Sequence, residues 1–165
     1  MKKVFLFAIM LLGLSFSTQA QEENAIGLRL GDNDGFGTEI SYQRLLNSDN
    51  RVELDLGWRN SSHYDAIKFT GLYQWTWDLD YEGFRWYAGA GGGLGTWEYN
   101  DDEYKERFDD DSGSFIFIAG DIGIEYNFDI PLQLSLDFRP EIYFGDDFRD
   151  DDFGSDIALS VRYRF

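Results

Sequence analysis

The sequence has no cysteine, few basic residues and, beyond its first 20 positions, no long apolar run. Without cysteine, neither a disulfide scaffold nor a lipid-anchored lipoprotein is available. Lys and Arg number 14 against 31 Asp and Glu, and the formal net charge of −17 excludes binding to nucleic acid through its phosphates. Such a charge favours cations, basic surfaces or polar sugars as partners. Because no segment after residue 20 could cross a membrane as a helix, a membrane location would require strands.

Residues 1–20 have the composition of an export signal. Two lysines precede an apolar run over residues 4–14, and the small residues Thr18 and Ala20 stand where a signal peptidase cuts. The run of about 11 residues is shorter than the roughly 20 that a membrane-spanning helix needs. We therefore expect a signal peptide at 1–20 and a single domain over 21–165. Hydrophobic residues make up 43% of the chain, too many for a disordered protein.

Eight segments alternate apolar and polar residues between turn residues, as β-strands with one apolar face do. In the last of them Ile157, Leu159 and Val161 share one side, while Asp156 and Arg162 share the other. The predicted strands cover residues 25–31, 36–46, 51–60, 66–79, 84–98, 115–128, 132–145 and 155–165. Connections 47–50, 80–83 and 129–131 are tight, whereas 100–114 and 146–154 are long and acidic. Short turns at one rim and longer loops at the other are typical of bacterial outer-membrane barrels with both termini in the periplasm.

One face of these strands is uncharged along its middle, and the other carries charges of both signs. Since a Lys or Arg at the lipid midplane costs about 2 to 4 kcal/mol, the uncharged face is expected to meet lipid. A soluble barrel such as a lipocalin, the alternative, has the opposite arrangement. The pattern predicts an all-β fold, an eight-stranded antiparallel up-and-down transmembrane β-barrel. Its predicted lumen charges are Arg29, Glu39, Glu53, Asp55, Arg59, Lys68, Arg85, Asp121, Glu125, Asp137, Arg139, Glu141 and Arg162, with Asp78, Asp156 and Arg164 at the same parity.

Aromatic residues on the lipid-facing parity gather beside the short turns. Amphipathic rings prefer the headgroup depth, where one edge meets water, so these residues are predicted to form a membrane-interface girdle. The girdle comprises Tyr42, Trp75, Trp77, Phe84, Trp86, Tyr126, Phe128, Tyr163 and Phe165.

With eight alternating strands, an aromatic rim and the terminal run Tyr163-Arg164-Phe165, the chain resembles the small outer-membrane barrels grouped around the OmpA transmembrane domain and OmpX. The resemblance covers all of residues 21–165. It implies a place in the outer membrane of a Gram-negative bacterium after export through the periplasm, contact with lipid and lipopolysaccharide, and recognition of the terminal aromatic residue by the outer-membrane assembly machinery. Because the sequence ends at Phe165, the resemblance does not extend to the cell-wall-binding domain of OmpA.

The lumen and the long loops offer different functions. Eight strands enclose a space that side chains just fill, so the inward charges are expected to pair and plug it; a narrow channel for small solutes is the alternative. The run Gly89 to Gly95 lies within a strand and is not a phosphate loop, because such loops lead into a helix. Instead its inward glycines are expected to leave room for long side chains. The loops combine acids with rings suited to an extracellular protein or glycan. The binding candidates are Tyr104, Phe108, Asp109, Asp110, Asp111, Phe148, Asp150, Asp151 and Asp152.

An enzyme is a further alternative, because some barrels of this size modify lipid A with a histidine, a serine and an acid. The single histidine, His63, has Ser61, Ser62 and Asp65 nearby. In the deacylases a serine stands two residues after the histidine, and here that position is Asp65, so no catalytic role is transferred. The carboxylates of the loops suit hard cations but show no defined cage. We therefore expect a monomeric, non-enzymatic barrel without metal or cofactor, with a structural or surface-binding role.

Overall fold

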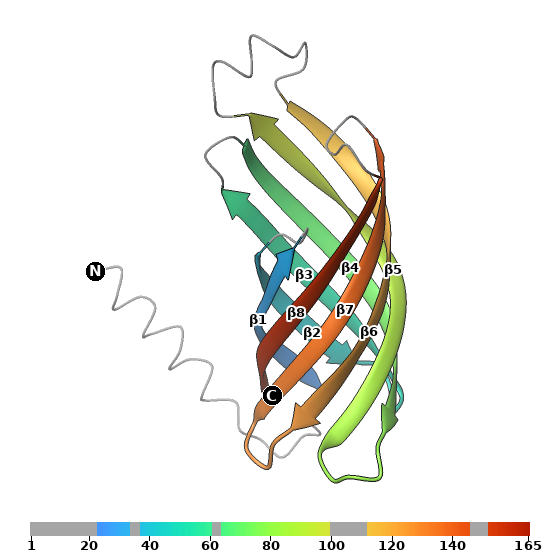
Figure 1. The fold of residues 1–165 in the computed structure, drawn as a ribbon. Coiled ribbons are helices and arrows are strands. Elements are labelled where there is room, and N and C mark those ends of the chain that lie inside the picture. Colours follow the sequence, from blue (N-terminus) through green and yellow to red (C-terminus); the bar gives the residue numbers. More distant parts are fainter. Residues whose placement is uncertain (1–22, 34–36, 61–63, 100–111, 146–151) are drawn as a thin grey trace, which may run out of the picture.

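The computed structural model describes residues 23–33, 37–60, 64–99, 112–145 and 152–165, which form one closed barrel of eight strands (Figure 1). The strands are β1 (Asn24–Asn33), β2 (Thr38–Leu45), β3 (Asn50–Asn60), β4 (Tyr64–Asp78), β5 (Phe84–Tyr99), β6 (Ser112–Asn127), β7 (Leu132–Gly145) and β8 (Phe153–Arg164). Each strand pairs antiparallel with its neighbours in the sequence, and β8 closes the barrel on β1. The predicted eight-stranded antiparallel up-and-down barrel is therefore confirmed. Among the described residues no helix is long and apolar enough to cross a membrane.

The strand ends differ from the predicted ones by at most three residues, and two differences have clear local causes. β2 begins at Thr38 instead of residue 36, because Gly37 adopts a φ of 81° that interrupts the extended backbone. β6 begins at Ser112 instead of residue 115, because Ser112 and Gly113 still pair with the end of β5. The hairpin of β5 and β6 is accordingly the longest, while β1 and β2 are short. The outer rim of the barrel is therefore uneven in height (Figure 1).

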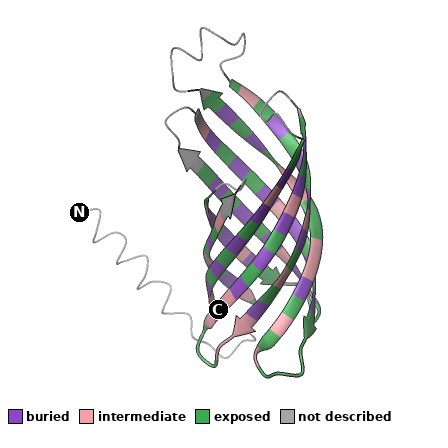
Figure 2. Cartoon of the chain, in the orientation of Figure 1, coloured by how far each residue is buried: buried purple, intermediate pink, exposed green. Residues whose placement is uncertain are grey.

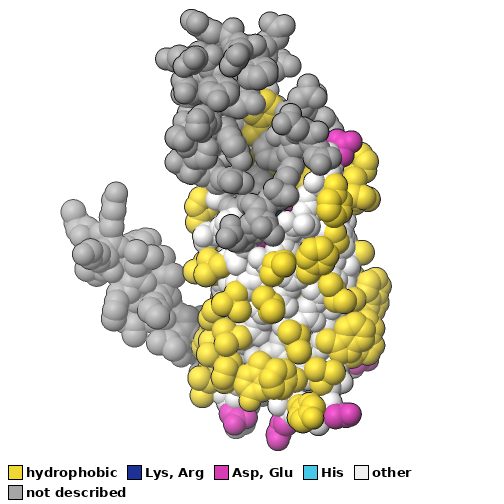
Figure 3. Space-filling view, viewed as in Figure 1, with side chains coloured by type: hydrophobic (Ala, Val, Ile, Leu, Met, Phe, Trp, Pro, Cys, Tyr) yellow, Lys and Arg dark blue, Asp and Glu magenta, His cyan; other side chains and the backbone are white. Residues whose placement is uncertain are grey.

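Burial alternates residue by residue along the strands (Figure 2). On β8, Ile157 and Leu159 are 52% and 50% exposed, whereas Ala158 and Ser160 between them are 1% and 0% exposed. The buried side is rich in charged and polar side chains, and the exposed side carries Leu, Ile, Val and aromatic residues. Figure 3 shows this hydrophobic surface over the wall of the barrel, with acidic side chains at the lower rim. The barrel is apolar outside and polar inside, the arrangement of a protein whose wall faces lipid.

The aromatic residues near the short turns pack against one another across strands. Trp77 and Trp86 are directly opposed on β4 and β5, and their rings stack at a centroid distance of 4.3 Å. Tyr126 lies 4.6 Å from both Phe84 and Phe128. All nine residues of the predicted girdle are half-buried or exposed on the outer surface of this rim. Their role as membrane-interface anchors remains a prediction.

Replacing Trp77 with alanine is expected to lower the free energy of unfolding through the lost stack with Trp86. Aromatic pairs contribute about 0.5 to 1.5 kcal/mol beyond their buried area. Urea unfolding of the barrel refolded in lipid vesicles, followed by fluorescence, measures the loss. The single variants Trp77→Ala and Trp86→Ala and the double variant together isolate the pair energy. Strictly additive losses would show that the rings do not stabilise each other.

Candidate functional site

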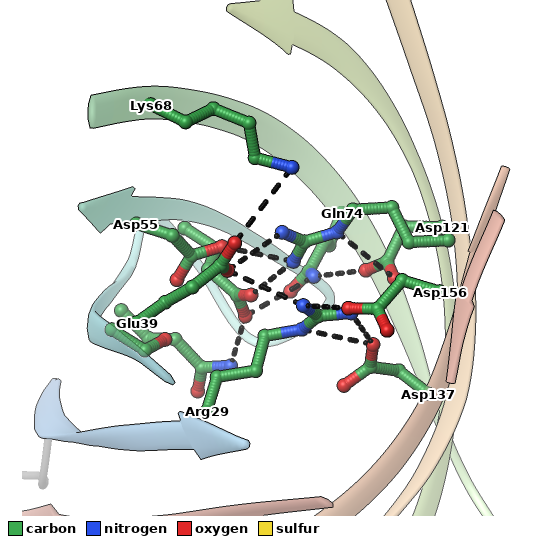
Figure 4. A network of polar contacts seen from close by, with 12 residues as sticks. Arg29, Glu39, Asp55, Lys68, Gln74, Asp121, Asp137 and Asp156 are labelled. Atoms are coloured by element: carbon green, nitrogen blue, oxygen red, sulfur yellow. Dashed lines mark hydrogen bonds and ion pairs between the residues drawn. The ribbon is translucent and has the colours of Figure 1, made fainter. Parts of the chain in front are cut away.

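Arg139 on β7 is the centre of a network of charges inside the barrel (Figure 4). Its side chain is 0% exposed, and its guanidinium lies within 4.0 Å of carboxylates from β2, β3 and β6. The distances are 3.4 Å to Glu39, 2.9 Å to Glu53, 2.9 Å to Asp55 and 3.9 Å to Asp121. One cation therefore neutralises parts of four acidic side chains from three other strands.

A second arginine, Arg29 on β1, joins the network from two strands away in the closed barrel (Figure 4). Its guanidinium lies 2.6 Å from Asp137 on β7 and 2.7 Å from Asp156 on β8. It also lies 3.3 Å from Glu39, the carboxylate that Arg139 contacts. Glu39 thus links the two arginines, and the network ties the first strands of the barrel to the last.

Lys68 on β4 extends the network toward the outer rim. Its ammonium group donates to Glu141 at 2.8 Å and lies 3.7 Å from Glu39. The Tyr143 hydroxyl also donates to Glu141. The ammonium group lies 5.1 Å from the centre of the Phe117 ring, within the range of a cation–π interaction. Lys68 therefore connects the charges to the aromatic side chains above them.

Amides and hydroxyls occupy other positions around the acids. Glu53 accepts a hydrogen bond from Gln43 at 2.5 Å and lies 3.2 Å from Arg162. Arg162 also donates to two buried serine hydroxyls, Ser41 at 3.0 Å and Ser135 at 2.7 Å. Every one of these side chains is less than 9% exposed. The middle of the lumen is thus filled by side chains that bind each other.

One buried arginine was missed in the sequence. Arg51 is 2% exposed, lies 2.5 Å from Glu125, donates to Gln74 at 2.5 Å and has its guanidinium 4.6 Å from the centre of the Tyr87 ring. It stands at the first position of a predicted strand, where a charge is ordinarily assigned to the turn. Arg51 and Glu53 are two positions apart on the same strand, so their side chains point to the same face, and this spacing is the signal that places Arg51 inside.

Three charges of inward parity lie nearer the water than expected. Asp78 is not in the lumen, because it is the last residue of β4 and its side chain is 84% exposed at the rim. Arg85 is 18% exposed at the same mouth, 2.8 Å from Asp78 and 4.0 Å from Glu125. Arg164 donates to the backbone carbonyl of Phe128 at 2.8 Å. The side chain of the predicted lumen residue Arg59 lies outside the described part of the structure.

The outer part of the lumen is apolar, a feature the charge pattern did not reveal. We call its buried cluster the aromatic cap, and it consists of Ala66, Leu72, Trp97, Phe115, Phe117, Ala119 and Tyr143. The Tyr143 ring lies 5.5 Å from Phe115 and 5.4 Å from Phe117. Alternation along this strand places Ile116 and Ile118 on the lipid face and so turns Phe115 and Phe117 inward, but it does not show that the inward rings gather into one cluster. The cap covers the charge network on the side away from the short turns.

The inward glycines of β5 make room for the aromatic cap. A Cβ atom on Gly93 would lie 2.6 Å from the Phe117 ring and would also collide with the backbone of Phe69. Gly95 lies in the same way under the ring of Phe115. On the outer face Gly71 has open space, with only one Leu54 atom 3.6 Å from its would-be Cβ. At these inward-facing glycines of β5, rings from β6 therefore occupy the space that a side chain of β5 would otherwise fill.

Substituting Gly93 with alanine is expected to destabilise the barrel by about 1 to 3 kcal/mol, the usual cost of overpacking a filled interior. The matched control is Gly71→Ala, which adds the same methyl group to the outer face and should change stability by less than about 0.5 kcal/mol. Both variants are compared by urea unfolding in the same detergent or lipid. If the two lose equal stability, backbone conformation rather than the Phe117 ring explains the glycine.

Comparison with solved structures identifies the architecture. The N-terminal β-barrel domain of OprF from Pseudomonas aeruginosa superposes with a TM-score of 0.63 at 16% identity, over 89% of this chain and 100% of that one. Neisserial surface protein A gives 0.60 at 15% identity, over 86% and 94%. The fold is that of the small eight-stranded outer-membrane β-barrels. The attachment invasion locus protein Ail of Yersinia pestis, solved in complex with the heparin analogue sucrose octasulfate, gives 0.51 at 16% identity over 86% and 96%. No protein-family model matches the sequence, and the search of curated proteins finds no match either.

Within this outer-membrane barrel fold, most of the predicted loop site lies outside the described residues. Asp152 is the exception: it is exposed, and its carbonyl accepts a hydrogen bond from the Tyr143 backbone at 2.7 Å. His63, Ser61 and Ser62 also lie outside the described residues. In the part of the chain that the structure describes, no three metal-ligating side chains form a group that could hold an ion. The loop residues outside the described part are Tyr104, Phe108, Asp109, Asp110, Asp111, Phe148, Asp150 and Asp151.

A cavity of about 610 Å³ opens at the outer ends of β4, β5 and β6. Its lining residues include the exposed Trp58, Thr96 and Glu98 and the half-buried Asp65, together with Trp97, whose side chain is buried in the aromatic cap. Rings combined with carboxylates and hydroxyls can stack on a sugar face or pack against a peptide while accepting its hydrogen bonds. At the opposite mouth the space among Gln43, Arg51, Arg85 and Glu125 is about 60 Å³, room for a few water molecules.

Proposed function

We propose that this chain is a non-enzymatic barrel of the Gram-negative outer membrane, with a plugged lumen and a structural or surface-binding role at its outer rim. The observation that carries the proposal is the filled interior. A charge network of fully buried side chains occupies the middle, and the aromatic cap lies above it. With the wall facing lipid and the lumen occupied by buried side chains, the outer rim is the surface available for binding. The proposal includes export of the chain by the signal peptide at 1–20 and its insertion into the outer membrane by the assembly machinery.

The chemistry of the outer rim favours a neutral or basic partner. Ail is seen with a highly sulfated sugar analogue, and the likeness in fold makes a glycan a reasonable class of ligand. This chain carries a net charge of −17 and has acidic loops, so a polyanionic glycan would be repelled. The cavity lined by Trp97, Glu98 and Asp65 suits an uncharged sugar or a basic protein surface instead. Lipopolysaccharide remains the expected neighbour in the same leaflet, with its phosphates bridged to the acidic rim by divalent cations.

A binding experiment on whole cells tests the proposal. Cells that produce the chain and cells that lack it are fractionated, and the outer-membrane fraction is probed for the protein. Fluorescent neutral glycans and a basic protein are then offered to both cell types. We expect the chain in the outer membrane and stronger binding by the producing cells, reduced by Glu98→Gln. Equal binding by both cell types, or a chain recovered in the soluble fraction, contradicts the proposal.

Reconstitution tests the plugged lumen separately. Purified barrels in liposomes are expected to admit no small sugar or amino acid in a swelling assay, because buried side chains that bind each other occupy the middle of the described lumen. Solute entry at a rate above that of empty liposomes would make the chain a channel and overturn the plug.

A further inference from the structure

The lumen holds more acidic than basic side chains. Among the buried side chains that the structure describes, five are basic and eight are acidic. The basic ones are Arg29, Arg51, Lys68, Arg139 and Arg162, and the acidic ones are Glu39, Glu53, Asp55, Asp121, Glu125, Asp137, Glu141 and Asp156. Arg85 adds no net charge, because it pairs with the exposed Asp78 at the mouth. An excess of negative charge in a dry interior is costly unless a positive charge accompanies it.

Asp55 is one of the acids that this shortage of positive charge affects. Its side chain is 1% exposed, and its one ion pair with a described residue joins Oδ2 to Arg139 at 2.9 Å. Arg139 also serves Glu39, Glu53 and Asp121, so Asp55 receives only a share of its charge. The other oxygen, Oδ1, is buried and has no hydrogen-bond partner within the described chain. Asp55 therefore has one shared cation and a carboxylate oxygen without a hydrogen bond.

A second unpartnered oxygen lies beside it. Thr70 on β4 is directly opposite Asp55 on β3, and its hydroxyl is buried without a hydrogen-bond partner among the described residues. Side chains at directly opposed positions have Cβ atoms about 4.5 to 5.5 Å apart, so the two groups face the same space. The next residue across the sheet is Gly93 on β5, which contributes no side chain. A carboxylate oxygen and a hydroxyl oxygen thus lie at directly opposed buried positions, and the Phe117 ring packs over Gly93 beside them.

We propose that a small monovalent cation of the sodium class binds inside the barrel between Asp55 and Thr70. Oxygen donors of this kind are what hard cations prefer. A divalent ion is disfavoured, because calcium takes 6 to 8 oxygens, often from several carboxylates, and no group of three ligating side chains occurs among the described residues. The bound cation supplies positive charge where Arg139 is shared four ways. It is a structural ion of the plug and is independent of any ligand at the outer rim.

Salt-specific stability tests the proposal. The purified full chain is refolded in detergent micelles and unfolded with urea in sodium chloride and in N-methyl-D-glucamine chloride, at equal ionic strength and pH. We expect the native barrel to unfold at a higher urea concentration in sodium chloride. The difference should disappear in Asp55→Asn and shrink in Thr70→Val, but persist in Asp80→Asn, which removes an exposed charge in a turn. Folding of each variant is checked by circular dichroism. If Asp55→Asn does not fold, the loss of the sodium effect is measured with Thr70→Val alone.

Sodium-23 nuclear magnetic resonance supplies a direct readout. The folded native barrel should broaden the sodium line, and most of the broadening should be lost in Asp55→Asn. Equal midpoints in the two salts for the native chain would overturn the proposal. So would an Asp55→Asn variant that is more stable than the native chain by the same amount in both salts, because a proton on Asp55 would then be the compensating charge.

Discussion

Arg139→Met is expected to be the most damaging single substitution in the lumen, with a loss of at least about 3 to 5 kcal/mol or outright failure to refold. Removing one partner of a buried ion pair costs that much because the other charge remains buried without compensation. Here the removed guanidinium contacts Glu39, Glu53, Asp55 and Asp121, all within 4.0 Å. Methionine fills a similar volume, so the loss reflects charge rather than a cavity. The measurement is the urea midpoint of the refolded barrel, followed by tryptophan fluorescence.

The matched control is the same substitution at the mouth of the barrel. Arg85 is 18% exposed, and its close partner Asp78 is 84% exposed, so both charges keep access to water. Exposed ion pairs contribute about 0 to 1 kcal/mol, and Arg85→Met should lose no more than that. Equal losses in the two variants would mean that the lumen is hydrated well enough to screen the network, and the plugged interior would then be wrong.

The sequence predicted the walls of the barrel well because the physics of the wall is local. A lipid-facing strand must alternate every two residues, so Ile157, Leu159 and Val161 identify their face without knowledge of any other strand. The two rims could be predicted in the same way, because tight and longer connections alternate along the chain and therefore lie at opposite ends of the barrel. The strand ends were less certain where glycine decided them, as Gly37 does at the start of β2.

The partners inside the lumen could not be predicted, because they depend on how the closed sheet is staggered. Arg29 meets Asp137 although 108 positions separate them, and only closure of β8 on β1 brings the two near. The aromatic cap escaped for a different reason. Phe115 and Phe117 alternate with Ile116 and Ile118, and the parity of the strand places the isoleucines outside, but it does not show that the inward rings pack together into one cluster. Burial separates them clearly, with Phe115 at 2% and Ile116 at 60% exposure.

Ile122→Arg is expected to destabilise the barrel in a bilayer by about 2 to 4 kcal/mol, the cost of a basic side chain near the midplane on the lipid face. Ile122 is 51% exposed on β6 and lies between Ala88 of β5 and Phe138 of β7, all on the outer surface. It stands four positions from the girdle residue Tyr126, well inside the apolar band. Unfolding by urea from vesicles of a phosphatidylcholine lipid measures the loss, and short-chain lipids that thin the bilayer should reduce it.

The control places the same arginine at the rim. Ile130 is 60% exposed in the turn between β7 and β6, so Ile130→Arg keeps its charge in water and should change stability by about 0 to 1 kcal/mol. A depth-dependent cost is the signature of lipid, because in water an arginine on an exposed surface is nearly neutral at either position. If Ile122→Arg and Ile130→Arg are equally harmless in vesicles, the apolar face does not meet the hydrocarbon core. The exposed isoleucines of β6 would then have to be covered by another protein, since an uncovered apolar wall of this extent does not remain monomeric in water.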